Sequence, residues 1–288
     1  RQVPKSQIKI NKPTLAKIDK LYIKEASAYV ERHFKNNIGN VNNFMFPVTH
    51  STSKKWLDFF IKEKFSKFGD YQDYIDKSNE FNYHSLLSTS INIGLLNPPD
   101  LIDTVCKYKK IIPINSFEGY VRQLFWREYQ RYTYIYFYSI NKNRKLNYFG
   151  NRRRLTKKWY NGTLGVIPLD NAIISGISTG YLHHISRLMV VGNFMNLYGI
   201  SPQHGFKWFM EFSCDSYDWV MCQNIYGMAF FSDGGKTMRR PYLSSSNYIL
   251  KMSNYKKDKW SDIWDKMYKD FLKKNKTSLL KYRYYYKV

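Results

Sequence analysis

Two adjacent histidines, His183 and His184, lie within an apolar helical pattern in the second half of the chain. Imidazole gains and loses a proton near neutral pH, so a histidine at such a place suits proton transfer to a bound molecule. Two acids, Asp215 and Asp218, the indole of Trp219 and the glycine pair Gly234-Gly235 follow at a distance that a helical fold can close. Histidines that merely pack in a core are the alternative, but this concentration of polar groups favours a functional site.

Helical periodicity predicts the elements that must position these groups. The expected helices cover about residues 21–34, begin near Thr52, Pro98 and Ser116, and cover about residues 169–198 and 203–221. No alternating pattern is long enough to predict a sheet, and no internal repeat is visible. The predicted fold class is therefore mainly α, with long irregular connections that a bound cofactor would explain.

The helix that begins near Ser116 carries an apolar stripe, of the kind that usually faces a core. With spacings of four, four, three and four residues, the stripe consists of Val121, Phe125, Tyr129, Tyr132 and Tyr136. Another face of the same helix carries Gln123, Arg127, Gln130 and Tyr134. The spacing therefore predicts a long amphipathic helix.

The chain is strongly basic, with 46 Lys+Arg against 22 Asp+Glu and a formal net charge of +24. A field of this sign attracts polyanions, of which nucleic acid is the commonest. Codon drift in an AT-rich genome is an alternative source of the lysines. Aromatic residues reach 18% of the chain. On a basic surface they suit stacking on unpaired bases, although many of them must form the core.

The sequence contains no run of about 18 apolar residues and no visible signal peptide. We therefore expect no membrane partner and an intracellular location, in the cytoplasm or nucleoid. The AT-rich composition also agrees with a viral source.

The three cysteines are Cys106, Cys214 and Cys222. Their spacing matches no CxxC pattern, and three thiolates cannot form an all-cysteine tetrad. We predict no metal site, and buried reduced thiols are the simplest interpretation.

Short motifs follow one another in a fixed order over roughly residues 45–270. They include Phe68-Gly69-Asp70-Tyr71-Gln72-Asp73, His84-Ser85-Leu86-Leu87-Ser88, Trp126-Arg127-Glu128, His183-His184, Arg187-Leu188-Met189, Tyr217-Asp218-Trp219-Val220 and Ser232-Asp233-Gly234-Gly235. The ordered set resembles the C-terminal, cofactor-binding part of the photolyase/cryptochrome superfamily. Within it, the chain is most similar to the bacterial deoxyribodipyrimidine photolyase-related branch, which includes the prokaryotic (6-4) photolyases.

The resemblance implies a nearly all-helical domain that holds FAD in a folded, U-shaped form, with DNA docked over the cavity. It divides the chain into a basic linker and leading helix (1–44), a helical FAD-binding catalytic domain (45–270) and a basic Tyr/Lys-rich tail (271–288). The N-terminal α/β antenna domain of the family is missing, so we expect no antenna pigment on this chain. Either a second chain supplies that domain, or it was lost or trimmed.

The resemblance also implies which residues bind FAD. His84, Ser85, Leu87 and Ser88 match a segment that binds the pyrophosphate through hydroxyls and backbone N–H groups. An ordinary serine-rich helix cap is the alternative. Further FAD contacts are expected from Gln123, Arg127, Asp215, Asp218 and Asn224. The stretch Met221-Cys222-Gln223 lacks an acid that some relatives have, so we expect different tuning of the flavin.

In the resembling (6-4) enzymes, histidine donates a proton to the lesion while the flavin donates an electron. That role would fall to His184, assisted by His183, with Trp126 lining the lesion cavity. Phosphate contacts are expected from Arg152, Arg153, Arg154, Lys157, Lys158, Arg239 and Arg240. An electron relay is expected from Trp208, Trp159, Tyr160 and Trp219. Core packing and solvated surface charge are the alternatives for these two sets.

Relatives in this branch hold a [4Fe–4S] cluster through four cysteines. The corresponding stretches here, Ser253-Asn254-Tyr255-Lys256-Lys257 and Val166-Ile167-Pro168, contain none. We therefore predict no cluster, with packing by Trp260, Trp264 and Tyr268 in its place.

The function implied by the resemblance is that of a light-dependent DNA repair lyase, a photolyase. Reduced FAD would transfer an electron to a UV photoproduct in damaged DNA. The histidine pair favours the (6-4) pyrimidine–pyrimidone lesion over the cyclobutane dimer. A cryptochrome-like blue-light photoreceptor is one alternative, although the basic charge favours repair. The other is the FAD- and DNA-binding half of a split photolyase that needs a partner chain.

Overall fold

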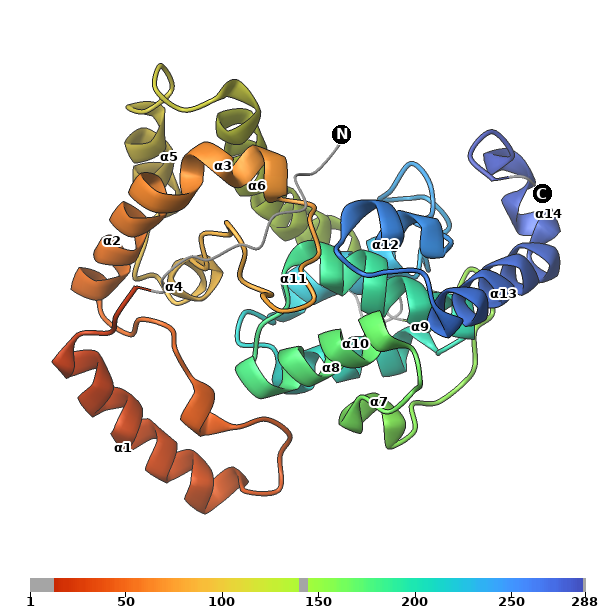
Figure 1. Ribbon diagram of the computed structural model, residues 1–288, viewed down its shortest axis with the longest axis horizontal. Coiled ribbons are helices and arrows are strands. Elements are labelled where there is room, and N and C mark those ends of the chain that lie inside the picture. Colours follow the sequence, from red (N-terminus) through yellow and green to blue (C-terminus); the bar gives the residue numbers. More distant parts are fainter. Residues whose placement is uncertain (1–12, 140–144, 287–288) are drawn as a thin grey trace.

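The computed structural model describes residues 13–139 and 145–286, which are almost entirely helical (Figure 1). In chain order the elements are α1 (Lys17–Phe34), η1 (Val41–Asn43), α2 (His50–Phe59), η2 (Phe60–Lys64), α3 (Phe65–Tyr71), α4 (Ser88–Asn92), α5 (Pro98–Cys106), α6 (Ile114–Thr133), η3 (Tyr134–Tyr138), α7 (Lys158–Asn161), α8 (Ile167–Thr179), η5 (Ser186–Gly192), α9 (Asn193–Tyr198), α10 (Pro202–Phe212), α11 (Asp218–Met221), η6 (Cys222–Ala229), α12 (Ser246–Met252), α13 (Lys259–Lys274), α14 (Lys276–Leu279) and η7 (Leu280–Tyr282). Within the described ranges, β pairing is limited to two isolated bridges. The predicted mainly α fold is therefore confirmed. None of the helices in these ranges combines the length and apolar character that crossing a bilayer requires.

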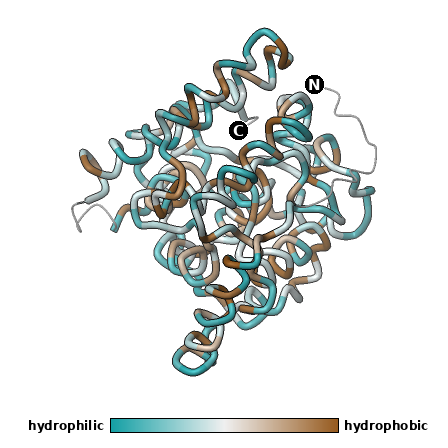
Figure 2. Tube along the Cα trace, turned by 90° about the vertical axis from the view of Figure 1, so that its left-hand side faces the viewer, coloured by the Kyte–Doolittle hydropathy of each residue, from teal (hydrophilic) through white to brown (hydrophobic). Residues whose placement is uncertain are grey.

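The hydrophobic core of the described residues has two large parts, beside two small aromatic clusters. One is formed by buried residues from 149–286 together with Ile75. The other is formed by residues from 46–124 together with Tyr181. In Figure 2, short hydrophobic stretches alternate with hydrophilic ones along the coils, as expected for amphipathic helices with one buried face. The boundary between the two parts of the core is where the candidate site lies.

Wide π-helical turns occur at several places in the described residues, each directly before or after an α-helix. Such turns are rare and concentrate at functional sites. The turn η5 contains Arg187, and the turn η6 contains Asn224. Both residues belong to motifs that the sequence singled out.

The predicted helix over 169–198 is wrong in one respect, because it is interrupted after Thr179. Gly180 ends α8 in the left-handed region with a φ of 68°. A Cβ added to Gly180 would lie 2.4 Å from the Sγ of Cys214, so the close approach requires glycine. The histidine pair consequently lies at the start of the next helical segment rather than inside a long helix.

The predicted helix over 203–221 is also interrupted, between α10 and α11. The intervening loop brings Asp215 to Arg187, whose Nη2 donates to the carboxylate at 2.9 Å. The hydroxyl of Ser213 donates to the same oxygen at 2.7 Å. The helix therefore breaks here, and the buried ion pair between Asp215 and Arg187 forms in place of further helical turns.

The apolar stripe of α6 and η3 exists, but its four aromatic members face solvent, and only Val121 packs partly buried against the core. Phe125 is 64% exposed, Tyr129 39%, Tyr132 60% and Tyr136 80%. The buried face of the helix is instead formed by Ser116, Phe117, Gly119, Tyr120, Leu124 and Gln130. Periodicity identified the members of the stripe correctly but not the side on which they lie.

Candidate active site

A cavity of about 760 Å³ lies between the two parts of the core, and its volume suits a cofactor-sized ligand. The predicted site residues that line the cavity are His84, Ser85, Leu87, Ser88, Gln123, Trp126, Arg127, His183, His184, Asp215, Trp219, Asn224 and Arg240. Other predicted residues are not part of its lining, namely Asp218, Trp159, Tyr160, Trp208, Arg152, Arg153, Arg154, Lys157, Lys158 and Arg239. Most of the predicted FAD site and both histidines are thus brought together.

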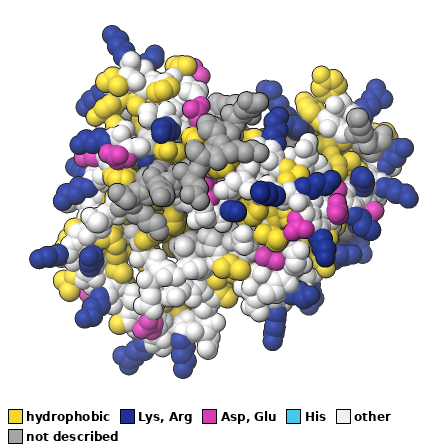
Figure 3. Space-filling view, in the orientation of Figure 1, with side chains coloured by type: hydrophobic (Ala, Val, Ile, Leu, Met, Phe, Trp, Pro, Cys, Tyr) yellow, Lys and Arg dark blue, Asp and Glu magenta, His cyan; other side chains and the backbone are white. Residues whose placement is uncertain are grey.

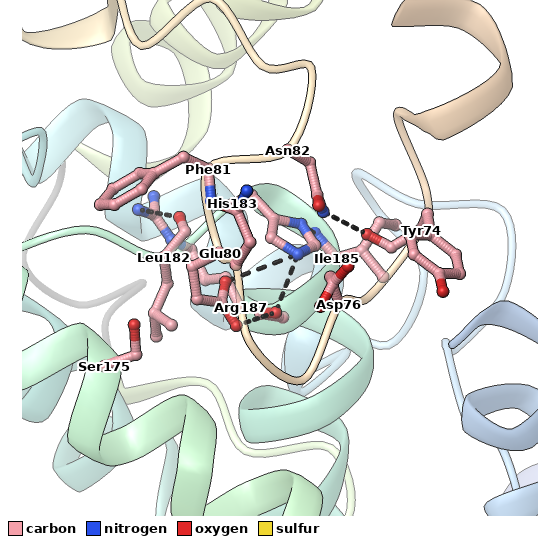
Figure 4. A network of polar contacts seen from close by, with 12 residues as sticks. Tyr74, Asp76, Glu80, Phe81, Asn82, Ser175, Leu182, His183, Ile185 and Arg187 are labelled. Carbon is pink, nitrogen blue, oxygen red and sulfur yellow. Dashed lines mark hydrogen bonds and ion pairs between the residues drawn. The ribbon is translucent and has the colours of Figure 1, made fainter. Parts of the chain in front are cut away.

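His183 is held by hydrogen bonds on both ring nitrogens. The backbone N–H of Ile185 donates to its Nδ1 at 3.3 Å. Its Nε2 lies 3.0 Å from Ser186 Oγ. The same nitrogen faces Glu80, whose Oε2 is 3.5 Å away (Figure 4). The side chain is fully buried, and burial, followed by the charge of His184, lowers the pKa of His183 well below its usual value. His183 is therefore a neutral, fixed ring beneath the cavity.

Glu80 is a site residue that the sequence did not single out. Ser186 Oγ donates to its Oε1 at 3.0 Å, and its other oxygen faces His183. Burial raises the pKa of Glu80 to about 7, against the lowering effect of its hydrogen bonds. This carboxyl group therefore exchanges its proton near neutral pH. No local sequence pattern identifies Glu80, because its hydrogen-bond partner Ser186 lies 106 positions later in the chain.

His184 occupies a different environment from its neighbour. Its side chain is 38% exposed, and its Nε2 lies 3.2 Å from Oδ1 of Asp73. Asp73 also lines the cavity. Of the two histidines, His184 is therefore the one whose ring is accessible to a molecule in the cavity.

His84 stacks on His183, with ring centroids 4.8 Å apart and an interplanar angle of 18°. Burial, followed by the charges of His183 and His184, lowers the pKa of His84 well below its usual value. One nitrogen from each of the three rings lies within 4.8 Å of the others. Both nitrogens of His183 already have hydrogen-bond partners, whereas Nε2 of His84 has none. The absence of a metal stays a prediction.

The loop before α4 has the features of an anion site. Leu86 has a φ of 59°, in the left-handed region that non-glycine residues rarely adopt, and Leu87 follows in the right-handed region. Such successive conformations turn backbone N–H groups toward a common concavity. The buried Lys64 donates through Nζ to the carbonyl of His84 at 3.1 Å, which brings positive charge to the loop. This loop suits a phosphate-bearing ligand, and Lys64 is a further site residue that the sequence did not reveal.

A second polar group connects α4 and α6 to the loop that contains Asp215. Burial alone would raise the pKa of Asp215, but Arg187, Ser213 and Ser88 outweigh it and hold the pKa below its ordinary value. Arg127 lies 4.8 Å from the ring of Trp219 in a cation–π arrangement. The ionised Asp215 therefore anchors the cavity wall.

Several nitrogen atoms on cavity-lining side chains are buried without a hydrogen-bond partner. They are Nε2 of His84, Nε of Arg127 and Nε of Arg187. Buried nitrogens of this kind rarely remain unsatisfied in native proteins, so they indicate a ligand rich in oxygen and nitrogen acceptors. The diphosphate and ring edges of FAD have this chemistry, and the residues present fit it.

The predicted relay residues differ in their placement. Trp208 and Trp159 are buried in the core, where Trp208 Nε1 donates to the carbonyl of Trp159 at 3.0 Å. Tyr160 packs partly buried against the same core, while Trp219 alone of the four lines the cavity. The relay role stays a prediction.

Near one of the stretches that correspond to iron–sulfur ligands in relatives, Tyr255 packs edge-to-face on Trp260, and the absence of a cluster stays a prediction. Trp260 and Trp264 are buried with edge-to-face rings 6.4 Å apart, and Tyr268 packs beside them in the same core. Of the cysteines, only Cys222 is buried, whereas Cys106 and Cys214 are exposed. The expectation of three buried thiols is therefore wrong for two of them.

Comparison with known proteins adds independent information. A family described as the FAD binding domain of DNA photolyase matches residues 120–260. A (6-4) photolyase of Agrobacterium fabrum is 36% identical over 273 residues, which cover 89% of this chain and 53% of that protein. Protein R855 of Acanthamoeba polyphaga mimivirus is 56% identical over 88 residues, 30% of this chain and 72% of that protein. The chain thus spans about half the length of the photolyase relative.

The fold has solved counterparts. A bacterial class III photolyase from Agrobacterium tumefaciens superposes with a TM-score of 0.57 at 18% identity, covering 78% of this chain and 45% of that one. A cryptochrome of Synechocystis superposes with a TM-score of 0.53 at 17% identity, covering 80% of this chain and 47% of that one. Both likenesses concern the helical fold.

Proposed function

Because the chain belongs to the photolyase/cryptochrome superfamily and contains its FAD-binding domain, we propose that it repairs UV-damaged DNA with FAD held in this cavity. One observation carries the proposal above the others. The cavity combines a phosphate-suited loop with a half-exposed histidine, His184, that is paired with the carboxylate of Asp73. A cofactor and a proton donor can therefore meet in one space.

His84, Ser85, Leu87 and Ser88 would hold the diphosphate, with Lys64 supplying positive charge behind the loop. The remaining contacts would come from Gln123, Arg127, Asp215 and Asn224. When bound and reduced, FAD absorbs near-ultraviolet or blue light and supplies an electron to a pyrimidine photoproduct. The unsatisfied nitrogens of His84, Arg127 and Arg187 support this assignment. Asp218 lies outside the lining, so its part in binding would be indirect.

His184 would donate the proton that the lesion needs once it has gained an electron. The carboxylate of Asp73, 3.2 Å from Nε2, orients the ring. His183 contacts Ser186 and Glu80 and so helps to fix the start of η5, directly after His184. Because the ring of His183 is neutral, it would not repel a protonated His184. A (6-4) lesion requires such proton transfer, so we propose it as the preferred substrate over the cyclobutane dimer.

Damaged DNA would dock over the mouth of the cavity. Trp126 and Arg240 line it and are placed to contact a base and a phosphate. Figure 3 shows Lys and Arg side chains distributed over most of the visible face, with fewer acids among them. The other predicted phosphate contacts are exposed but do not line the cavity: Arg152, Arg153, Arg154, Lys157, Lys158 and Arg239. They would attract DNA through the overall positive electrostatic field of the protein.

Two measurements test the proposal. An absorption spectrum of the purified chain after incubation with FAD should show bound flavin. Under light, the reduced protein should restore normal thymines in an oligonucleotide that carries a (6-4) lesion, and more slowly in one that carries a cyclobutane dimer. Failure to bind flavin would contradict any flavin function, whereas bound flavin without light-dependent repair would favour a photoreceptor.

We also propose, as a second candidate, the FAD- and DNA-binding half of a split enzyme that works with a partner chain carrying the antenna domain. Repair by the isolated, FAD-loaded chain would contradict a strict need for such a partner. An elemental assay for iron tests the accompanying proposal that no [4Fe–4S] cluster is present.

A further inference from the structure

The solvent-facing stripe of α6 and η3 has no role in the site described above. It consists of Phe125, Tyr129, Tyr132 and Tyr136, which together form a row of exposed rings along one helix. Monomeric proteins rarely expose so many large rings in a row without a partner. The question is which class of molecule these rings contact.

The stripe is continuous with the mouth of the cavity. Trp126, which lines the cavity, stacks on Tyr129 with ring centroids 4.8 Å apart and an interplanar angle of 25°. The hydroxyl of Tyr129 donates to the carbonyl of Thr237 at 2.7 Å, which fixes the orientation of this ring. A molecule that leaves the cavity past Trp126 therefore meets Tyr129 next.

Farther along the helix the rings are arranged for stacking. Tyr132 and Tyr136 are nearly parallel, with an interplanar angle of 12° and centroids 6.4 Å apart. Their exposed fractions of 60% and 80% leave the ring faces accessible. Flat faces of this kind accept any nucleobase, because every base has a π-face.

The charge around the stripe favours a polyanion over an apolar protein. Arg122 and Arg131 of α6 are exposed, and Lys236 lies 5.4 Å from the ring of Phe137 in η3. The acid Glu128 is bonded to both Arg127 and Arg131, so its charge is compensated. Interleaved rings and cations are the combination that single-stranded nucleic acid recognises.

We propose that this stripe stacks the bases of an unpaired DNA strand beside the cavity. Unpaired bases arise where a damaged nucleotide leaves the duplex to enter the cavity. The inference rests on the proposed function for the identity of the strand. Binding of the strand itself requires neither light nor FAD.

The test is equilibrium binding in the dark of a fluorescent, undamaged thymidine oligonucleotide, with Tyr132→Ala/Tyr136→Ala as the variant. Each lost stacking contact should weaken binding about 5- to 150-fold. The matched control is Tyr22→Ala/Tyr29→Ala on α1, where the two rings are 49% and 59% exposed but are not part of the cavity lining. Tyr132→Trp/Tyr136→Trp should restore binding. Circular dichroism should show that all variants are folded.

An unchanged affinity in the alanine variant, or an equal loss in the α1 control, would overturn the proposal. Sedimentation tests whether a second copy of the chain covers the stripe instead. The stripe is a protein interface if wild type self-associates, the alanine variant does not, and both bind DNA with equal affinity. Photorepair of a (6-4) oligonucleotide by wild type is measured separately. Its failure with normal strand binding would contradict the proposed repair function and leave the stripe intact.

Discussion

The Nε2 of His184 lies 3.2 Å from Oδ1 of Asp73, a residue 111 positions earlier in the chain. Asp73 follows α3, whereas His184 lies just before η5, so the contact joins distant segments at the wall of the cavity. Asp73 thereby acts as a positioning residue for the proposed proton donor. Sequence reasoning noted the motif that contains Asp73 without assigning it a role.

Replacement of this partner should impair repair without loss of the cofactor. In Asp73→Asn, the amide keeps the shape but replaces the carboxylate acceptor that orients the His184 ring, so the repair yield should fall about tenfold. Flavin absorbance should stay at the wild-type level. Asp70→Asn is the matched control, because Asp70 belongs to the same motif but is exposed and accepts a hydrogen bond from Asn115. Equal yields for Asp73→Asn and wild type would remove Asp73 from this role.

Glu80 should make stability depend on pH. Burial raises its pKa to about 7 from an ordinary 4.5, so the folded state holds a proton that the unfolded state releases between these values. Wild type should therefore lose stability relative to Glu80→Gln as pH rises from about 4.5 through 7, by up to about 3 kcal/mol. Urea unfolding of both proteins at pH 5 and pH 8 measures this difference. A difference that is constant or grows in favour of wild type would contradict the burial argument.

The ion pair of Arg187 with Asp215 should be sensitive to loss of one partner. Arg187→Ala leaves a buried carboxylate without its cation, so the free energy of unfolding should fall by about 3–5 kcal/mol. Arg131→Ala is the control, because its pair with Glu128 is half-exposed and should contribute about 1 kcal/mol or less. Similar losses in both variants would show that Asp215 is not held as described.

Two constraints at Gly180, the left-handed backbone and the steric contact that an added Cβ would make with Cys214, can be measured separately. Gly94 has a φ of 79° with nothing within 4 Å of an added Cβ, whereas at Gly180 the added Cβ would lie 2.4 Å from Cys214 Sγ. Gly94→Ala should cost about 1 kcal/mol from its backbone alone. Gly180→Ala should cost distinctly more and reduce flavin binding, because the chain to His183 must shift. Thermal unfolding compares the two, and equal losses would argue against the steric contact.

How much of this site was predictable differs among its residues. The ordered motifs placed His84, Arg127 and His184 in one cavity, because motif order carries over with the fold. Glu80 and Lys64 were not predicted, because their role depends on burial in the folded protein and no local sequence pattern indicates it. Periodicity cannot distinguish an inward stripe from an outward one, which is why the rings of α6 were expected to face a core.

The break at Gly180 illustrates a second limit. Helical propensity extends through this segment, but a tertiary contact with the Cys214 loop requires a left-handed glycine there. The break moves the histidines from the middle of a helix to its start, where their rings reach the cavity. Long-range contacts of this kind become visible only in three dimensions.

The most direct test of the account compares light-driven repair of a (6-4) oligonucleotide by FAD-loaded wild type, His184→Ala and His204→Ala. His204 lies on α10 and does not line the cavity, so it serves as the control. We predict that wild type and His204→Ala restore thymine under light, and that His184→Ala keeps its flavin but loses repair by about 100-fold or more. Repair by His184→Ala at the wild-type rate would contradict the central claim.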